Sequence, residues 1–154
     1  YDLTYCGSKK LTDKIENYDI GKMLLSPTRS YAPLLKKIFE KVGRDKINGI
    51  IHCTGGGQTK ILHFVDDLHI MKNNLFETPP IFKLIMNESN TDPKEMYKVF
   101  NMGHRMEIYI HPDYASDIIE ISKSVGIDAK IIGEVLKSQK NKLSIQSELG
   151  NFEY

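Results

Sequence analysis

The chain lacks long apolar runs and an excess of charge of either sign. Its 154 residues include 21 Lys or Arg and 20 Asp or Glu, so the formal net charge is +1. A protein that binds nucleic acid mainly through charge carries a strong basic excess, and the balance here excludes that class. No apolar run approaches the length of about 18 residues that a membrane-spanning helix needs. We therefore expect neither a nucleic acid nor a membrane as a partner.

Cysteine is also scarce, since the chain contains only Cys6 and Cys53. Two cysteines cannot build a disulfide-rich scaffold, and no secretory segment is in view. We predict that both are reduced thiols of a cytoplasmic protein. His52 and Cys53 are neighbours in the sequence, and neighbours on a strand point to opposite faces of a sheet. They make a poor metal pair, so we predict no metal site.

What is present fits one globular domain. Apolar residues make up 40% of the chain and charged residues 27%, which disfavours disorder. The length matches a single domain. Because the sequence begins with Tyr1 rather than Met, we expect a piece of a longer protein. On this interpretation residues 1–22 are an irregular lead-in from a missing N-terminal domain, and residues 23–154 form the domain itself.

Apolar spacing and breaker residues predict helices that alternate with strands. The expected helices cover 32–42, 58–65, 80–86, a segment that opens at Asp92 and Pro93, and 113–125. The expected strands cover 47–53, 68–76, 106–110, 129–136 and 143–146. This order predicts an α/β (α+β) fold, a layered domain with a mixed β-sheet flanked by helices. Its strand–helix–strand ending resembles ferredoxin-like elements.

One candidate site follows the strand at 47–53, in the segment His52, Thr54, Gly55, Gly56 and Gly57. Glycines allow positive φ values, which let successive backbone N–H groups converge on an anion. A helix N-terminus behind them adds partial positive charge. The segment matches neither the P-loop nor the dinucleotide fingerprint. Phosphate recognition and a bland tight turn both fit the pattern.

A second candidate site is the loop Asn101, Met102, Gly103, His104 and Arg105. Asn and Gly suit unusual backbone conformations, and a titratable imidazole stands beside a fixed cation. The alternative interpretation is a helix C-terminal stop. Other candidates have ordinary explanations. We interpret His111 as a helix-cap residue before Pro112, and Tyr97 and Phe100 as core residues.

Several segments, in this order along the chain, resemble one known family. They are Leu25-Ser26-Pro27-Thr28-Arg29-Ser30-Tyr31, His52-Cys53-Thr54-Gly55-Gly56-Gly57, Pro79-Pro80-Ile81-Phe82, Glu95-Met96-Tyr97-Lys98-Val99-Phe100-Asn101-Met102-Gly103 and Ile132-Gly133-Glu134-Val135. Each is weak alone, but together they resemble the C-terminal domain of the phosphoribosylformylglycinamidine cyclo-ligases, also called aminoimidazole ribonucleotide synthetases. Two departures are Ile61-Leu62-His63-Phe64, where many relatives have Asn and then Pro-Arg, and His104-Arg105, where many have an aliphatic residue and Gly.

The resemblance implies a two-domain ATP-dependent ligase of purine biosynthesis, of which 23–154 would be the cyclo-ligase C-terminal domain. The missing N-terminal domain would supply most of the ATP and Mg²⁺ site and the homodimer interface, so this fragment alone is expected to be inactive. In that family ATP phosphorylates the formyl oxygen of formylglycinamidine ribonucleotide, and a substrate nitrogen then closes the imidazole ring with loss of phosphate.

The resemblance also implies a cleft that faces the absent domain and takes a phosphorylated ribonucleotide. The residues placed there are Thr28, Arg29, His52, Thr54, Gly55, Gly56, Gly57, Asn101, Met102 and Gly103, with His104 and Arg105 as further candidates. No catalytic base is assigned. Two other functions stay open, namely another ATP-dependent synthetase of the same superfamily, or a stand-alone ferredoxin-like module that binds a small molecule.

Overall fold

The computed structural model describes residues 7–154, and Cys6 lies outside them. The helices are α1 Ile20–Leu24, α2 Ala32–Lys41, α3 Pro80–Ser89, α4 Pro93–Val99 and α5 Ala115–Lys123, with 3₁₀ helices η1 Arg44–Lys46, η2 Gly57–His63 and η3 Pro112–Tyr114. The strands are β1 Lys14–Ile15, β2 Tyr18–Asp19, β3 Ile47–His52, β4 Leu68–Lys72, β5 Met106–Ile110, β6 Gly133–Lys137, β7 Lys142–Ser147 and β8 Gly150–Glu153. No helix of this part of the chain is long and apolar enough to cross a membrane.

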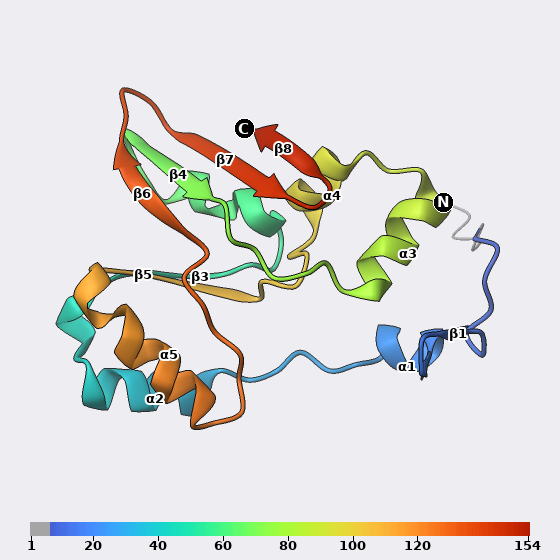
Figure 1. The fold of residues 1–154 in the computed structure, drawn as a ribbon, viewed down its shortest axis with the longest axis horizontal. Coiled ribbons are helices and arrows are strands. Elements are labelled where there is room, and N and C mark those ends of the chain that lie inside the picture. Colours follow the sequence, from blue (N-terminus) through green and yellow to red (C-terminus); the bar gives the residue numbers. More distant parts are fainter. Residues whose placement is uncertain (1–6) are drawn as a thin grey trace.

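The expected α+β class and mixed sheet are confirmed. The main sheet has the order β6-β4-β7-β8, in which β4 runs parallel to β7 and the other pairs are antiparallel. β3 and β5 form a separate antiparallel pair. Figure 1 shows this pair between the four-stranded sheet above and helices α2 and α5 below. The segment β5–α5–β6 therefore joins the two sheets.

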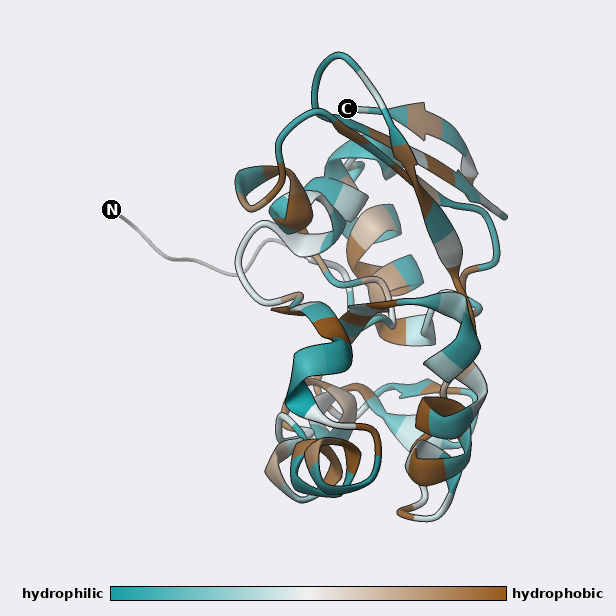
Figure 2. Ribbon diagram, turned by 90° about the vertical axis from the view of Figure 1, so that its left-hand side faces the viewer, coloured by the Kyte–Doolittle hydropathy of each residue, from teal (hydrophilic) through white to brown (hydrophobic). Residues whose placement is uncertain are grey.

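Two apolar clusters hold these layers together. One packs Leu34 and Ile38 of α2 and Ile118 and Ile121 of α5 against one face of β3 and β5. The other lies between the opposite face of that pair, the four-stranded sheet, η2 and α4, and includes Cys53, Ile61, Ile70, Met96, Tyr97, Leu143 and Ile145. The two clusters lie on opposite faces of β3–β5, and Figure 2 shows hydrophobic segments (brown) both in the part of the molecule near the C-terminus and in the opposite part. The strand pair β3–β5 thus has apolar side chains packed against both of its faces, and Ile51 and Glu107 are its buried residues.

Several predicted boundaries were wrong for identifiable reasons. The segment after the glycines is the 3₁₀ helix η2 instead of an α-helix, as is common for short connectors. The strand expected at 129–136 begins only at Gly133, because the Ile132 carbonyl instead accepts the N–H groups of Asn73 and Asn74. β4 ends at Lys72, four residues earlier than expected, and β8 was not predicted. The lead-in contains β1, β2 and the start of α1.

Candidate functional site

The structure brings the two predicted loops into direct contact. The Cys53 N–H donates to the Arg105 carbonyl at 2.8 Å, which joins the start of one loop to the end of the other. The Gln58 side-chain Nε2 donates to the Asn101 carbonyl at 2.7 Å. Between these bonds, a Cβ built on Gly57 would lie 2.5 Å from the Phe100 carbonyl oxygen. Only glycine fits there, and the two loops form one structural unit.

The glycine turn, residues 54–57, keeps part of its backbone available. Gly55, Gly56 and Gly57 have φ values of 62°, 86° and 48°, all in the left-handed region that favours glycine. Within residues 7–154, the N–H groups of Gly55 and Gly56 donate to no protein acceptor. Gly55 is exposed, Gly56 is half-buried and Gly57 is buried. The turn can therefore offer two successive free amides to a ligand, as an anion-binding concavity does.

Lys60 is a further residue at this turn that the sequence reasoning missed. Its Nζ donates to the carbonyls of His52 at 3.1 Å and Thr54 at 3.0 Å. The ammonium group therefore lies at the rim of the glycine turn and adds positive charge beside the free amides. The sequence did contain a signal for this residue. Lys60 follows Gly56 by four residues, a spacing at which one helical turn brings the lysine side chain back beside the glycine turn.

The segment Asn101–His104 is a tight turn bonded within itself. The His104 N–H donates to the Asn101 carbonyl at 2.9 Å, and the Gly103 N–H donates to Asn101 Oδ1 at 2.9 Å. Met102 and Gly103 have φ values of 50° and 99°, as a type I′ turn requires. The amides of Gly103 and His104 are engaged. The side-chain Nδ2 of Asn101 donates to no acceptor among residues 7–154, so it can still donate to a ligand.

His104 and Arg105 have opposite surroundings. Arg105 is exposed, whereas the His104 side chain is 4% exposed and its ring packs 5.2 Å from the Phe76 ring. His104 Nε2 accepts the Phe76 N–H at 2.9 Å, so the proton of the neutral ring is on Nδ1. Burial lowers the pKa of His104 to about 4, although nearby Glu107 acts in the other direction. The imidazole is neutral at physiological pH.

This buried histidine should make stability depend on pH. Its pKa falls from an ordinary 6.5 to about 4 on folding, so the unfolded chain binds the proton more tightly. The stabilisation is complete above pH 6.5 and is lost as pH falls from there towards 4. Between pH 7 and pH 5 we expect a loss of about 2 kcal/mol in the free energy of unfolding, measured by urea denaturation.

His104→Gln is the matched variant for that measurement. A Gln side-chain oxygen can accept the Phe76 N–H but does not titrate. The loss in the free energy of unfolding between pH 7 and pH 5 should therefore be about 2 kcal/mol smaller in this variant. Equal pH dependence in the two proteins would show that His104 is not the group responsible.

His52 and Cys53 point to opposite sides, as predicted. His52 is exposed and makes an edge contact with the Tyr31 ring, with 6.2 Å between ring centroids. Cys53 is buried, and burial together with nearby Glu107 raises the pKa of its thiol to about 12. Such a thiol is not a nucleophile at neutral pH. Among residues 7–154 no three His, Cys, Asp or Glu side chains gather in a metal-binding arrangement.

The structure does not bond Thr28 or Arg29 to the two loops. Both are exposed in the segment between α1 and α2. The Arg29 Nη1 donates to the Gly126 carbonyl at 3.2 Å, just beyond α5. In contrast, His111 caps η3 by accepting the Asp113 N–H, as predicted, and Tyr97 and Phe100 pack into the core. Thr28 and Arg29 thus remain site predictions from the resemblance alone.

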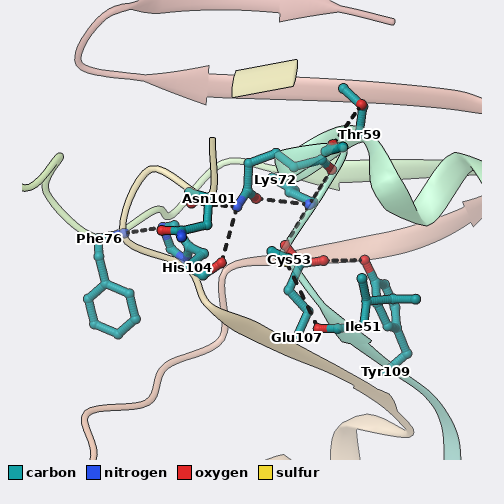
Figure 3. A network of polar contacts seen from close by, with 11 residues as sticks. Ile51, Cys53, Thr59, Lys72, Phe76, Asn101, His104, Glu107 and Tyr109 are labelled. Carbon is teal, nitrogen blue, oxygen red and sulfur yellow. Dashed lines mark hydrogen bonds and ion pairs between the residues drawn. The ribbon is translucent and has the colours of Figure 1, made fainter. Parts of the chain in front are cut away.

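A buried ion pair lies directly behind the glycine turn, and sequence reasoning missed it. Lys72 Nζ and Glu107 Oε1 are 2.6 Å apart, with side chains only 2% and 4% exposed. The Tyr109 hydroxyl donates to Glu107 Oε2 at 2.7 Å, and its pKa is raised by burial and by that carboxylate. Figure 3 shows this network between β3, β4 and β5, next to Cys53. The charges are hydrogen-bonded, as burial requires.

An open cavity of about 1240 Å³ extends along β3 and β5, and residues of β4, β6, α5 and the segment 127–132 also line it. Its lining includes His52, Lys60, His104 and Arg105, which also belong to the two loops or flank them. That volume exceeds what a nucleotide-sized ligand needs. Gly55, Gly56 and Asn101 are not among its lining residues, so the cavity borders the two loops only at these flanking positions.

Comparison with known proteins gives consistent matches. The family model described as "AIR synthase related protein, C-terminal domain" matches residues 4–146. The phosphoribosylformylglycinamidine cyclo-ligase of Methanococcus vannielii is 38% identical over 116 residues, which cover 75% of this chain and 32% of that protein. That of Syntrophus aciditrophicus is 34% identical over 140 residues, with 85% and 38% coverage. The chain thus spans about a third of the length of these relatives.

A solved structure shares the fold. Escherichia coli HypE, a hydrogenase maturation protein, aligns with a TM-score of 0.54 at 19% identity. The alignment covers 73% of this chain and 35% of that protein. At this identity the likeness concerns the arrangement of helices and strands.

Proposed function

The chain belongs to the AIR synthase related protein, C-terminal domain family, and from that premise we propose that it is the C-terminal portion of an ATP-dependent cyclo-ligase. The whole enzyme would convert formylglycinamidine ribonucleotide to aminoimidazole ribonucleotide, ADP and phosphate. In this proposal the chain contributes the cleft that holds the phosphorylated ribonucleotide. The homodimer and the cytoplasmic location stay predictions of the resemblance.

The observation that carries the proposal is the pair of free amides on the glycine turn. Gly55 and Gly56 donate to no acceptor in the described chain, and Lys60 adds a cation beside them. Backbone amides and an ammonium group suit the ribose 5-phosphate of the substrate. The Asn101 side chain on the neighbouring loop supplies a further donor. Positioning of this kind contributes much of the rate in phosphoryl-transfer chemistry.

ATP and Mg²⁺ are assigned to the part of the protein that this chain does not include. Among residues 7–154 no group of three or more His, Cys, Asp or Glu side chains gathers in a way that could hold a metal ion. What residues 7–154 would do is bind and orient the ribonucleotide. No catalytic base is assigned among them.

A chimera tests the proposal. The N-terminal two thirds of the Methanococcus vannielii enzyme would be joined to this chain in place of its own C-terminal third. We expect the 154-residue chain alone to show negligible ATP turnover, and the chimera to release ADP only with formylglycinamidine ribonucleotide. Robust ATP hydrolysis by the isolated chain, or a folded chimera that cannot close the imidazole ring, would contradict the proposal.

Gly56→Val should impair substrate binding in that chimera. A β-branched residue resists the positive φ of 86° at this position, so the free amides should lose their orientation. We expect KM for the ribonucleotide to rise by about tenfold or more, from the loss of a charge-assisted hydrogen bond. Gly43→Val is the matched control, because Gly43 has a φ of 95°, the side chains of Asp45 and Lys46 are nearest to an added Cβ, and the residue lies away from the turn. Equal effects of the two changes on KM would rule out a specific role of the turn.

A further inference from the structure

Gln58, Lys72 and Glu107 form a buried bridge behind the glycine turn. Counted over the whole residue, backbone included, their exposed fractions are 1%, 1% and 6%. Lys72 Nζ donates to the backbone carbonyl of Gln58 at 2.9 Å, to its side-chain Oε1 at 3.0 Å and to Glu107 at 2.6 Å. Both oxygens of Gln58 therefore accept hydrogen bonds from one buried ammonium group.

The same Gln58 side chain reaches the other loop. Its Nε2 donates to the Asn101 carbonyl at 2.7 Å and to the His104 carbonyl at 3.4 Å. Gln58 also follows directly after three glycines, which have more backbone freedom to lose on ordering than any other residues. The hydrogen bond from the Cys53 N–H to the Arg105 carbonyl anchors the chain before the three glycines. The bond from the Gln58 side chain to the Asn101 carbonyl anchors it after them.

We propose that Gln58, held by Lys72 and Glu107, is a positioning residue that sets the glycine turn against the Asn101–His104 turn and orders the Gly55 and Gly56 amides for a phosphate group. This inference rests on the proposed function. In this proposal the three residues act through the glycine turn and not by contact with the phosphate. They act by lowering the conformational entropy that binding must remove, which is how preorganisation raises affinity.

Removal of the Gln58 amide group should affect affinity more than folding. In Gln58→Met the Asn101 carbonyl still accepts the His104 N–H, and Lys72 still bonds to the residue 58 carbonyl and to Glu107. Met has a similar volume and suits irregular cores. The variant should therefore fold, with a lower melting temperature because it loses buried hydrogen bonds, as the control variant below also does. The turn meanwhile loses its link to the second loop.

The experiment titrates inorganic phosphate into the 154-residue chain and follows the backbone amide NMR signals of Gly55 and Gly56. We expect saturable shifts in the unmodified chain and about tenfold weaker affinity in Gln58→Met. The control is Ser122→Ala, which removes a buried hydrogen bond to the Ile127 carbonyl in the other core cluster. It should lower the melting temperature but leave phosphate affinity unchanged.

Two failures are distinguishable. Saturable shifts with equal affinity in the unmodified chain and in Gln58→Met would overturn the bridge and leave the proposed function standing. No shift at Gly55 and Gly56 in the unmodified chain would overturn the anion site and the bridge with it.

If Gln58→Met does not fold, Gln58→Asn replaces it, because the shorter polar side chain cannot span to Asn101. In the chimera, the bridge predicts a higher KM for the ribonucleotide at unchanged kcat.

Discussion

Lys72→Met is expected to lower the free energy of unfolding by about 3–5 kcal/mol, because it leaves the Glu107 carboxylate buried without its cation. Lys72 and Glu107 are both nearly inaccessible to water. The Tyr109 hydroxyl would remain as a hydrogen-bond donor to the carboxylate. The measurement is urea denaturation at pH 7 followed by circular dichroism.

The double variant Lys72→Met with Glu107→Gln separates charge burial from packing. It leaves no buried charge, and the new amide oxygen can still accept from Tyr109. We expect it to recover most of the lost stability, since a buried ion pair often adds little over neutral groups of similar volume. Lys36→Met removes an exposed Lys36–Glu40 pair and should change stability by less than about 0.5 kcal/mol. A single variant as stable as the double one would contradict this account of the pair.

Gly57→Ala is expected to cost about 2–5 kcal/mol, the sum of a left-handed φ and an overpacked contact. Its φ is 48°, and the added Cβ would lie 2.5 Å from the Phe100 oxygen and 2.6 Å from the Tyr97 oxygen. These are backbone atoms at the end of α4, which cannot move without shifting the helix. Thermal unfolding measures the loss.

Gly55→Ala is the matched control for that change. Gly55 has a similar φ of 62°, but nothing lies within 4 Å of its added Cβ. It should therefore lose only the conformational part, about 1–2 kcal/mol. If the two substitutions proved equally costly, the two loops would not be in the close backbone contact described here.

Sequence patterns predicted most helices because their caps and apolar faces are local. Asp92 accepts the Lys94 N–H ahead of Pro93, as its position suggested. Strand limits were harder, because the ladder partners lie far along the chain. β6 begins where Gly133 allows its backbone to approach Met71 on β4, and no local pattern reports such an approach.

The glycine turn was predictable as a turn, since only glycine tolerates three successive positive φ values at low cost. The buried ion pair between Lys72 and Glu107 could not be predicted from the sequence. A charged residue inside a short strand usually marks the exposed face, so no local pattern indicates that Lys72 in β4 and Glu107 in β5 are buried. Only the fold shows that β3–β5 is covered on both faces and that these opposite charges meet there.

Hydrogen–deuterium exchange with ribose 5-phosphate tests the central claim most directly. The claim is that the free amides of Gly55 and Gly56 bind the phosphate of a ribonucleotide. Millisecond exchange of the segment 54–58 would be measured in the 154-residue chain with ribose 5-phosphate, with ribose and with neither. We predict slower exchange with ribose 5-phosphate only. Exchange that is the same in all three samples, or slowed equally by ribose, would contradict the account.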